Sequence, residues 1–473
     1  MKNEFKDKKV LLIGLGILGG GVSIANWLIK QKAEVAIFDS KPKEYFSDSI
    51  KQIKGNVKYI FENCNEEEIR NADIIVINQA VPPTNPLVML AEKIGKPIYN
   101  ESKIFYEICN KPIIAITGTR GKTTTTNWTA YLLGKKALIA GNSVEEPLLK
   151  ILPKTKKTTC KVVVNEIPSF QLERFSHSPS IALITNIFVD HLNRHETLEN
   201  YASIKGNIFK NQKENDKLIL NYDNNWTEFY LKQNPKSEIW FFSLKTLPKD
   251  KNGIFYSNDF IYLQEKNKTP EKILNVKEFI KFWGMHNLAN LISSILAAYL
   301  AGEKIINIKK KTKTLPQVKF RQERTVNNKN LEIINDTAST SPEGGIAAVE
   351  RFASPYCILI SGSTDAGLEY ADWGKLVAKI IPIENIVLLD SSATKKMLAE
   401  LTKYIDISKI PVKNTLEECI DIAFEKINEL KKKNPKNKIT LLFSPSGKSF
   451  EKFKNEFDRG EKFNKIIKSK KIK

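Results

Sequence analysis

Cysteine is scarce in this chain of 473 residues, and the five cysteines are scattered along it. They form neither a disulfide framework nor a zinc-binding spacing, so we expect a protein of the reducing cytoplasm. Long apolar runs are also lacking, since none approaches the ~20 residues that cross a bilayer. The polar start, Met1–Lys9, leads directly into an expected strand and does not resemble a secretory signal.

Acidic residues are fewer than basic ones, and the net charge is +21. A charge of this size could indicate a nucleic-acid partner. The lysines, however, are spread through the chain among many asparagines and isoleucines, which is typical of solvated surfaces in a compositionally biased protein. A general basic field would also attract an anionic substrate. We therefore predict neither nucleic-acid binding nor membrane insertion.

The length and the order of the expected elements indicate three α/β domains. Strands and helices alternate from the N-terminus to about residue 110, which is typical of a parallel sheet. A second unit opens at Lys111, and the basic segment Lys309–Lys313 followed by Pro316 marks another boundary. The predicted domains are residues 1–110, 111–313 and 314–473. The expected strands include Val35–Asp39, Lys217–Asn221 and Cys357–Ser361, and the polar stretch Lys245–Lys272 contains short strand-like pieces.

The most informative segment is Ile113–Thr124. A β-branched strand gives way to two glycines and then to a helix, so backbone N–H groups and the helix dipole should attract an anion. Lys122 can reach terminal phosphates and the Thr123 hydroxyl can hold Mg²⁺, although Ile116 replaces the first glycine of the common pattern. The predicted phosphate loop comprises Gly118, Thr119, Arg120, Gly121, Lys122, Thr123 and Thr124.

A second glycine-rich loop lies near the N-terminus, at Gly14-x-Gly16-x-x-Gly19, and Asp39 ends the next expected strand. Read alone, this pattern predicts NAD binding and an oxidoreductase. It is also compatible with any diphosphate-containing nucleotide, with Asp39 contacting a ribose or a base. The second nucleotide site at Lys122 favours an enzyme with two nucleotide substrates over a dehydrogenase.

Four further patches carry chemically useful side chains: Glu166 at a strand end, Asp190-His191 after another strand, Lys205 on an expected helix, and Gly284–Asn290 at a helix start. Each alone has an ordinary explanation, namely a surface acid, a loop histidine, an exposed lysine or a helix cap. Their joint order along the chain is what makes them candidates for a catalytic site.

Together with the phosphate loop, these patches resemble the Mur ligase family over essentially the whole chain. The matching residues are Glu166, Ser169-Phe170-Gln171, Asp190-His191, Lys205, Gly284-x-His286-Asn287-x-x-Asn290, Arg321, Asn335-Asp336 and Ser444-Pro445. Ser169–Glu173, Asn335–Thr337 and Ser449–Asn455 resemble the branch that adds D-glutamate to UDP-N-acetylmuramoyl-L-alanine in peptidoglycan precursor synthesis. The resemblance implies a Rossmann-like UDP-sugar domain, a central P-loop ATPase domain and a Rossmann-like amino-acid domain, in a cytoplasmic monomer.

The resemblance also implies a mechanism, in which ATP phosphorylates the donor carboxylate and the amine of the amino acid attacks the acyl phosphate. Developing charge on phosphoryl and carboxyl oxygens calls for cations placed in advance. The implied catalytic residues are Lys122, Lys205, His191 and Glu166. Two Mg²⁺ ions would be held by Thr123, Glu166, His191 and a carbamylated Lys205. Carbamylation needs a neutral amine, so the surroundings must lower the pKa of this lysine.

The remaining implied site residues fall into three groups. ATP would contact the phosphate loop together with Asn287, Asn290, Arg321 and Asp336. The UDP-sugar would contact Gly16, Ile17, Leu18, Asp39, Ser40, Asn142, Ser169 and Gln171. The amino acid would contact Thr340 together with Ser449 and Phe450, which are expected to start the C-terminal helix.

The chain departs from the family pattern at its acceptor and donor loops. Ala338 and Ala366 stand where the family has lysines near the acceptor amino acid, and Arg120, Lys319 or Lys448 could substitute. The donor loops differ as well, with Asn78–Pro82 in place of Ser-Pro-Gly and Gly141–Val144 keeping only the start of Gly-Asn-Ile-Gly.

Three alternatives to D-glutamate addition stay open: a Mur-type ligase for another amino acid, a folate polyglutamate synthase, and a basic P-loop ATPase that binds nucleic acid. The glycine-rich N-terminal domain argues against the folate enzymes, which lack a UDP-sugar domain.

Overall fold

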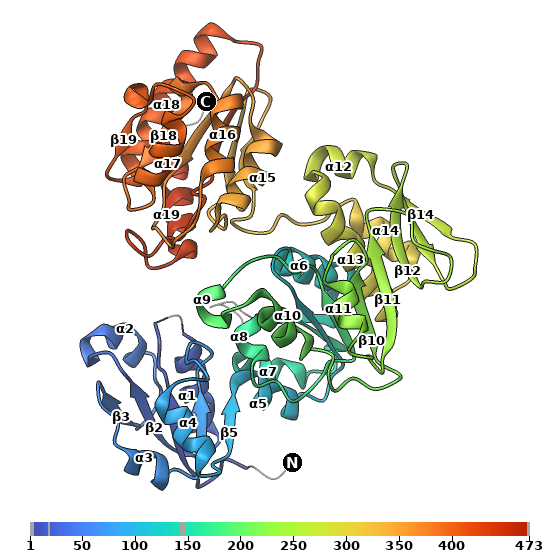
Figure 1. Cartoon of the computed structure of the whole chain (residues 1–473), viewed down its shortest axis with the longest axis vertical. Helices are drawn as coiled ribbons and strands as arrows, with labels where there is room; N and C mark the ends of the chain where they lie inside the picture. Colours follow the sequence, from blue (N-terminus) through green and yellow to red (C-terminus); the bar gives the residue numbers. More distant parts are fainter. Residues whose placement is uncertain (1–3, 18, 142–146, 471–473) are drawn as a thin grey trace. The chain divides into compact units, whose positions relative to one another are not determined.

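A computed structural model describes residues 4–17, 19–141 and 147–470 of the chain (Figure 1). It is an α/β protein with three sheets. The chain divides into two compact units, Met1–Leu315 with two sheets and Pro316–Lys473 with the third. The expected fold class is confirmed. In the described part of the chain, no helix is long and apolar enough to cross a membrane.

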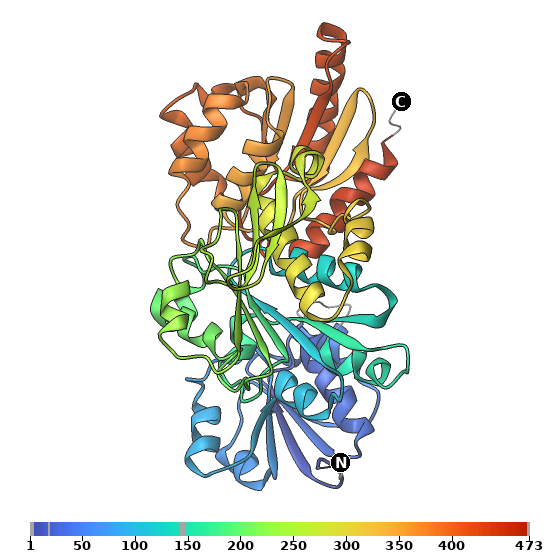
Figure 2. The same cartoon turned by 90° about the vertical axis from the view of Figure 1, so that its right-hand side faces the viewer.

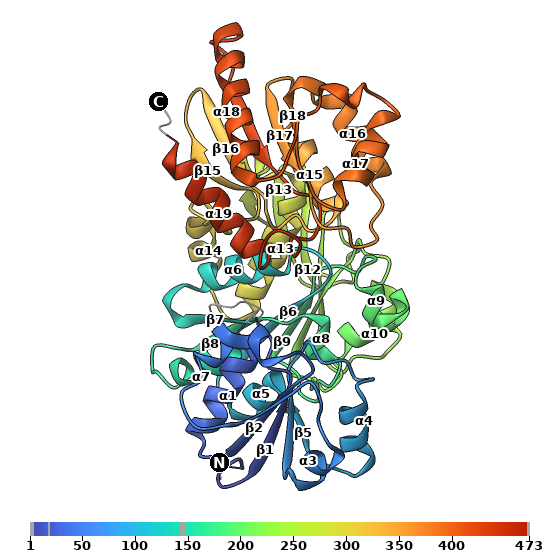
Figure 3. The same ribbon diagram turned by 90° about the vertical axis from the view of Figure 1, so that its left-hand side faces the viewer.

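The N-terminal sheet is fully parallel, with the strand order β3-β2-β1-β4-β5. Helices α1 and α5 cover one face, and α3 and α4 cover the other (Figure 3). Its strands are β1 Lys9–Ile13, β2 Glu34–Asp39, β3 Lys58–Phe61, β4 Ile74–Ile77 and β5 Ile98–Asn100. Its helices are α1 Gly20–Lys30, α2 Ser47–Ile50, α3 Glu66–Asn71, α4 Pro86–Lys93 and α5 Glu101–Ile108.

The central sheet has nine strands in the order β14-β13-β12-β11-β10-β9-β6-β8-β7, and its neighbouring strands are parallel except for the antiparallel pairs β12–β13 and β13–β14. These strands are β6 Ile113–Thr117, β7 Ala137–Gly141, β8 Val162–Glu166, β9 Ile181–Ile184, β10 Lys217–Asn221, β11 Glu238–Ser243, β12 Gly253–Ser257, β13 Phe260–Gln264 and β14 Glu271–Asn275.

Helices cover both faces of the central sheet. One face packs against α6 and α13, and the other shares a continuous apolar core with the N-terminal sheet. This shared core explains why the first two sheets form one compact unit. The helices are α6 Lys122–Leu133, α7 Leu148–Thr155, α8 Ser169–Leu172, α9 Leu192–His195, α10 Leu198–Gly206, α11 Thr227–Leu231, α12 Lys277–Trp283, α13 Met285–Leu300 and α14 Ile305–Thr312.

The C-terminal sheet has the order β15-β16-β20-β17-β18-β19, with β15 as its antiparallel edge. Its strands are β15 Glu323–Asn327, β16 Leu331–Asn335, β17 Cys357–Ser361, β18 Ile386–Leu389, β19 Val412–Lys413 and β20 Ile439–Phe443. Its helices are α15 Pro342–Phe352, α16 Ala371–Ile380, α17 Thr394–Thr402, α18 Leu416–Lys433 and α19 Glu456–Ser469. The last turns of α18 extend beyond the strands (Figures 2 and 3).

Candidate functional site

The expected phosphate loop joins β6 to α6, and its glycines are sterically required. Gly118 and Gly121 have φ angles of +142° and +82°. A Cβ atom at Gly118 would lie 1.9 Å from Oγ1 of Thr185, and one at Gly121 would lie 2.2 Å from Oδ1 of Asn290. Any side chain at these positions would displace the segments that pack against the loop.

The segment after β9 fixes the backbone of this loop. Asn186 accepts hydrogen bonds from the N–H of Thr119, through its carbonyl, and from the N–H of Arg120, through Oδ1, both at 2.9 Å. The Thr185 hydroxyl donates to the Arg120 carbonyl at 2.7 Å. The Nζ of Lys122 donates to the Thr119 carbonyl at 3.0 Å. The loop is therefore preorganised at the N-terminus of α6, where the helix dipole favours an anion.

The start of α13 lies beside the phosphate loop. Asn290 Nδ2 donates to Asn287 Oδ1 at 3.0 Å, and the Thr125 hydroxyl of α6 donates to Asn290 Oδ1 at 3.4 Å. The structure thus brings both asparagines of the expected ATP site next to the loop. Gly284, with φ +78°, caps this helix, so His286 and Asn287 lie inside its first turn.

Lys205 is buried beneath the loop, with 1% of its surface exposed. Its Nζ donates to Oγ1 of Thr117 at 3.3 Å and lies 4.6 Å from the centroid of the Tyr201 ring. Burial, reinforced by the charge of Lys122, holds the pKa of Lys205 well below its usual value, against the opposing charges of Asp190 and Glu166. Lys122, Glu166 and Lys205, which are far apart in sequence, thus share one electrostatic environment, and Lys205 is not a surface lysine.

His191 follows β9 and adopts the left-handed conformation, with φ +54°, at the N-cap of α9. Its Nε2 lies 3.8 Å from Oδ2 of Asp190, and Nη1 of Arg120 lies 4.0 Å from the same oxygen. Its ring lies 5.0 Å from that of Phe170. Across the described ranges, no three or more His, Cys, Asp or Glu side chains are grouped so as to hold a metal ion by themselves.

The N-terminal glycine loop follows the carboxyl end of β1. Oδ2 of Asp39 accepts hydrogen bonds from the N–H groups of Leu15 and Gly16, at 2.9 and 3.2 Å. Asp39 therefore organises the loop itself. Ile17 is 48% exposed at the tip of the loop, and Ser40 is exposed beside it. Leu18 and Asn142, also expected in this site, lie outside the described residues.

Two buried residues of α8 complete the expected UDP-sugar group. The hydroxyl of Ser169 shares a hydrogen bond of 3.0 Å with Nε2 of His195. Burial lowers the pKa of His195 to about 4, so its ring is neutral at pH 7. The Nε2 of Gln171 donates to Oε1 of Gln79, in the loop after β4, at 2.8 Å. This hydrogen bond links the central domain to the loop after β4.

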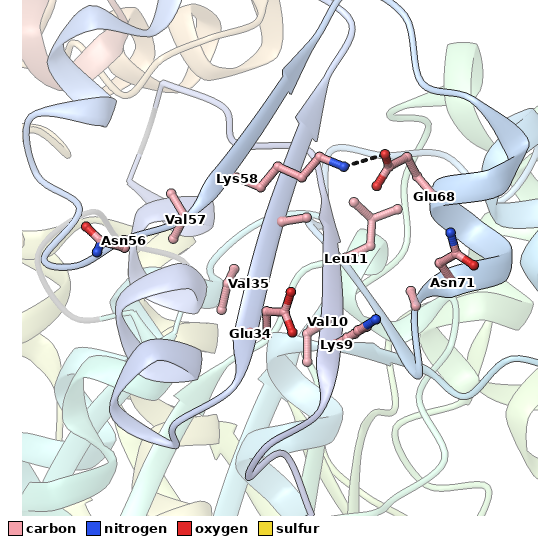
Figure 4. A pocket seen from close by; sticks show the side chains of 12 residues that line it. Lys9, Val10, Leu11, Glu34, Val35, Asn56, Val57, Lys58, Glu68 and Asn71 are labelled. Atoms are coloured by element: carbon pink, nitrogen blue, oxygen red, sulfur yellow. Dashed lines mark hydrogen bonds and ion pairs between the residues drawn. The ribbon is translucent and has the colours of Figure 1, made fainter.

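A cavity of about 530 Å³ lies elsewhere on the N-terminal sheet (Figure 4). It is lined by the amino-terminal residues of β1 and β2, Lys9 and Glu34, and by Lys58 of β3, which pairs with Glu68. The glycine loop lies at the opposite, carboxyl end of β1. The cavity contains none of the expected site residues and is not the nucleotide site.

In the C-terminal unit, Asp336 follows β16 and is 5% exposed. The Ser444 hydroxyl donates to its Oδ2 at 2.9 Å, and the N–H of Gln322 donates to its Oδ1 at 3.1 Å. Burial raises the pKa of Asp336 to about 7, although these hydrogen bonds and the charge of Arg321 oppose the shift. Arg321 and Asp336 thus belong to one electrostatic group.

The expected acceptor residues lie on loops at the carboxyl edge of the C-terminal sheet. Ser449 is buried, and its hydroxyl has no hydrogen-bond partner among the described residues, whereas Phe450 is 61% exposed. The expectation that these two residues start the C-terminal helix is wrong, because α19 begins only at Glu456, where Asn455 caps it. Thr340 lies in the loop that precedes α15. This loop neighbours the loop of Ser449, because the N–H of Gly447 donates to the carbonyl of Ser339.

The two alanines that replace family lysines lie on the same edge. Ala338 is held through its N–H, which donates to the Phe320 carbonyl, and Ala366 is exposed. Two lysines flank the loop of Ala366. Lys448 pairs with Thr364 through the backbone, and Nζ of Lys396 lies 3.0 Å from Asp365.

Sequence reasoning missed several residues of the first unit's site. Tyr201 packs against the amine of Lys205, and Arg194 and Glu173 form a buried ion pair. The sequence indicates Asp190 only as part of the Asp190-His191 pair. These roles depend on contacts between segments distant in sequence, and the only available signal was proximity to the recognised motifs.

Comparisons with known proteins agree with this geometry. The fold and the loop define an α/β protein with a phosphate-loop domain at its centre. The chain matches the family model for the Mur ligase middle domain over residues 116–298, and that for the Mur ligase MurD-like N-terminal domain over residues 8–100.

Curated relatives extend the match over nearly the whole chain. A UDP-N-acetylmuramoylalanine--D-glutamate ligase of Thermoanaerobacter sp. (strain X514) is 33% identical over 470 residues, covering 98% of this chain and 99% of that protein. The ligase of the same name from Clostridium tetani is 31% identical and covers 99% of each chain. The chain therefore belongs to the Mur ligase family.

Solved structures support the same fold at lower identity. MurF from Acinetobacter baumannii aligns with a TM-score of 0.60 at 15% identity, covering 97% of this chain and 93% of that one. UDP-N-acetylmuramate-alanine ligase MurC from Thermotoga maritima aligns with a TM-score of 0.56 at 19% identity, covering 98% and 99%.

Proposed function

We propose that the protein is an ATP-dependent ligase that joins D-glutamate to UDP-N-acetylmuramoyl-L-alanine in peptidoglycan precursor synthesis. The observation that carries this proposal is the buried Lys205 next to Lys122 and Glu166, beneath a preorganised phosphate loop. The full-length similarity to curated D-glutamate ligases supports the same conclusion.

Each domain has a separate substrate in this proposal. Residues 1–110 hold the UDP-sugar, and the residues near its nucleotide are Gly16, Ile17, Asp39 and Ser40. The next domain contributes Ser169 and Gln171 to the same site. Residues 111–313 bind ATP through the phosphate loop, Asn287 and Asn290. Residues 314–473 bind the amino acid through Thr340, Ser449 and Phe450, and Arg321 and Asp336 are proposed as further ligands of ATP.

The proposed reaction proceeds in two steps. An oxygen of the donor carboxylate attacks the γ-phosphorus of ATP, the bond to the β-phosphate oxygen breaks, and ADP leaves. The neutral amine of the amino acid then attacks the acyl carbon, inorganic phosphate leaves, and the nitrogen loses one proton. Lys122 and the N-terminus of α6 offset the charge of the transferring phosphoryl group.

The donor set of the site fits Mg²⁺. This ion prefers oxygen ligands, and it takes only one or two protein carboxylates when substrate phosphates are present. A Mg²⁺ site therefore does not need a larger acidic cluster, and the described residues contain none. Thr123 and Glu166 would hold one ion, and His191 with a carbamylated Lys205 would hold a second. Bound Mg²⁺ would neutralise charge on the phosphate and carboxylate oxygens.

Lys205 is suited to carbamylation. Its lowered pKa leaves more of the amine neutral at pH 7, and the neutral amine can attack CO₂. The neutral nitrogen forms a bond to the carbon of CO₂ and loses one proton, so a neutral amine becomes an anionic carbamate. The positive charge of Lys122 would stabilise that anion.

One observation favours a second candidate, a ligase of the same mechanism for another amino acid. Ala338 and Ala366 remove two cations from the expected acceptor site, and leaving a buried carboxylate unpaired is costly. Lys448 and Lys396 flank the loop of Ala366 and are candidate replacements.

Two measurements test the proposal. Release of phosphate from ATP should require both UDP-N-acetylmuramoyl-L-alanine and an amino acid, whereas a nucleic-acid-binding ATPase would respond to neither. Calorimetric titration should show binding of the UDP-sugar and none of NAD. Tight NAD binding would revive the oxidoreductase interpretation of the N-terminal loop.

A further inference from the structure

Arg194, at the end of the segment that carries His191, reaches the loop after β4 of the N-terminal sheet. Its Nη1 donates to the carbonyl of Ala80 at 3.0 Å. Its Nη2 lies 3.1 Å from the carbonyl of Val81 and 3.4 Å from that of Gln79. One guanidinium thus holds three consecutive carbonyls of the Asn78–Pro82 loop.

Glu173, just after α8, fixes this guanidinium. Nε of Arg194 donates to Oε1 at 2.8 Å and Nη2 donates to Oε2 at 2.7 Å, in a bidentate pair. The two side chains are only 14% and 8% exposed. A planar, bidentate and largely buried pair of this kind has one preferred geometry, which a lysine could not reproduce.

The loop that Arg194 holds packs directly on the N-terminal glycine loop. A Cβ atom at Gly14 would lie 2.8 Å from Cγ2 of Val81, and one at Gly16 would lie 3.2 Å from Nδ2 of Asn78. The side chain of Asn78 is buried between the two loops. Movement of the Asn78–Pro82 loop would therefore move or unpack the glycine loop.

The residues next to Arg194 and Glu173 orient the other half of the same site. His195, whose Nδ1 lies 3.8 Å from Oε1 of Glu173, shares the hydrogen bond with the Ser169 hydroxyl. Gln171 bonds to Gln79 of the loop. Glu173 therefore lies between two groups of expected UDP-sugar ligands. One group is the glycine loop of the N-terminal domain, and the other is Ser169 and Gln171 of the central domain.

We propose that Arg194 is a positioning residue for the UDP-sugar. The Glu173–Arg194 pair keeps the Asn78–Pro82 loop, and through it the glycine loop, in register with Ser169 and Gln171. This inference rests on the proposed function, because it takes these groups to be the UDP-sugar site. Arg194 touches neither the reacting atoms nor ATP in this assignment, and it acts through the loop that it holds.

The test compares Arg194→Ala and Arg194→Lys with Arg174→Ala. Arg174 is a matched control, since it also joins the central domain to the N-terminal sheet, through Glu92 of α4, but within the described part of the chain it has no hydrogen bond to the loop. Calorimetry with UDP-N-acetylmuramoyl-L-alanine gives the Kd, and steady-state assays give KM for ATP. Circular dichroism and thermal melting identify variants that fail to fold.

Both Arg194 variants should weaken UDP-sugar binding about ten- to a hundredfold, as expected for loss of charge-assisted hydrogen bonds, while KM for ATP stays within about twofold. Arg174→Ala should leave both constants near the values of the unmodified protein. The inference is overturned if Arg194→Lys restores normal binding, or if Arg194→Ala changes the UDP-sugar Kd no more than Arg174→Ala does. It is also overturned if KM for ATP rises in parallel.

The proposed function fails in a different way, through the absence of UDP-sugar binding by the unmodified protein. If Arg194→Ala does not fold, Glu173→Gln is the second variant, because it removes the charge from the pair and keeps its shape. A folded Glu173→Gln protein with unchanged UDP-sugar affinity would then contradict the inference.

Discussion

The amine of Lys205 lies 3.3 Å from the hydroxyl of Thr117, which ends the strand that leads into the phosphate loop. Lys205 comes from α10, eighty-eight residues further along the chain. Its side chain is buried against Tyr201. Burial and the charge of Lys122 lower the pKa of Lys205, and the charges of Asp190 and Glu166 act in the opposite direction. A buried lysine with a lowered pKa at the edge of an anion site indicates chemistry at that lysine.

Replacing Lys205 with alanine should abolish nearly all ligation, because the site loses the anion that carbamylation supplies. Small carboxylic acids such as acetate should restore part of the activity by placing an anion in the space left by the side chain. ¹³C NMR of the unmodified protein with labelled bicarbonate should show a carbamate resonance that Lys205→Ala lacks. Full activity of this variant without added acid would show that the lysine has no role in the reaction.

Replacing Lys122 with alanine should lower ligation by orders of magnitude and leave the fold intact. The glycines and the segment Thr185–Phe188 preorganise the loop backbone without this side chain. Lys122 supplies the charge that offsets the γ-phosphate during transfer. Phosphate-release kinetics measure the loss, and thermal melting serves as the control. Near-normal turnover would contradict the phosphate-loop assignment.

Restoring a lysine at position 366 should strengthen D-glutamate binding. A charge-assisted hydrogen bond contributes ~1.5–3 kcal/mol, so KM for D-glutamate should fall about ten- to a hundredfold in Ala366→Lys. Lys448→Ala and Lys396→Ala, made in the unmodified protein, show whether either lysine already pairs with the acceptor. If D-glutamate already binds tightly and Ala366→Lys has no effect or harms binding, another cation has taken over this role.

Asp336 should make the stability of the C-terminal unit fall with rising pH. Its folded-state pKa is about 7 against an ordinary value of 3.8, so between these pH values the folded protein keeps a proton that the unfolded chain loses. This contribution is fully present below about pH 4 and is lost as the pH rises through about 7. Asp336→Asn should remove this part of the pH dependence in thermal melts from pH 4 to pH 8. An unchanged slope would show that Asp336 is ionised throughout.

Much of the fold could be predicted from the sequence, because parallel strands buried on both faces give clear apolar runs. The strands at Val35–Asp39, Lys217–Asn221 and Cys357–Ser361 were expected within a residue of their observed limits. The short strand β3 was missed because its residues are only partly buried and its pattern is weak. The antiparallel edge, β13 and β14, appeared only as strand-like pieces in a polar stretch.

The site was predictable where a local motif fixes the geometry. The glycine loops and the order of Glu166, His191 and Lys205 are visible in the sequence. The burial of Lys205 is not, because it depends on Tyr201 and on β6, which arrive from other parts of the chain. The link from Arg194 to the loop after β4 was hidden for the same reason, since the contact spans more than one hundred residues.

The central claim, ATP-dependent addition of D-glutamate to a UDP-sugar, is tested most directly by mass spectrometry of the product. The protein is incubated with ATP, Mg²⁺, UDP-N-acetylmuramoyl-L-alanine and each of a panel of amino acids. We predict a product heavier than the UDP-sugar by one glutamate residue, formed with D-glutamate and only when ATP is present. Formation of no amide product with any amino acid, while ATP is hydrolysed all the same, would contradict the claim.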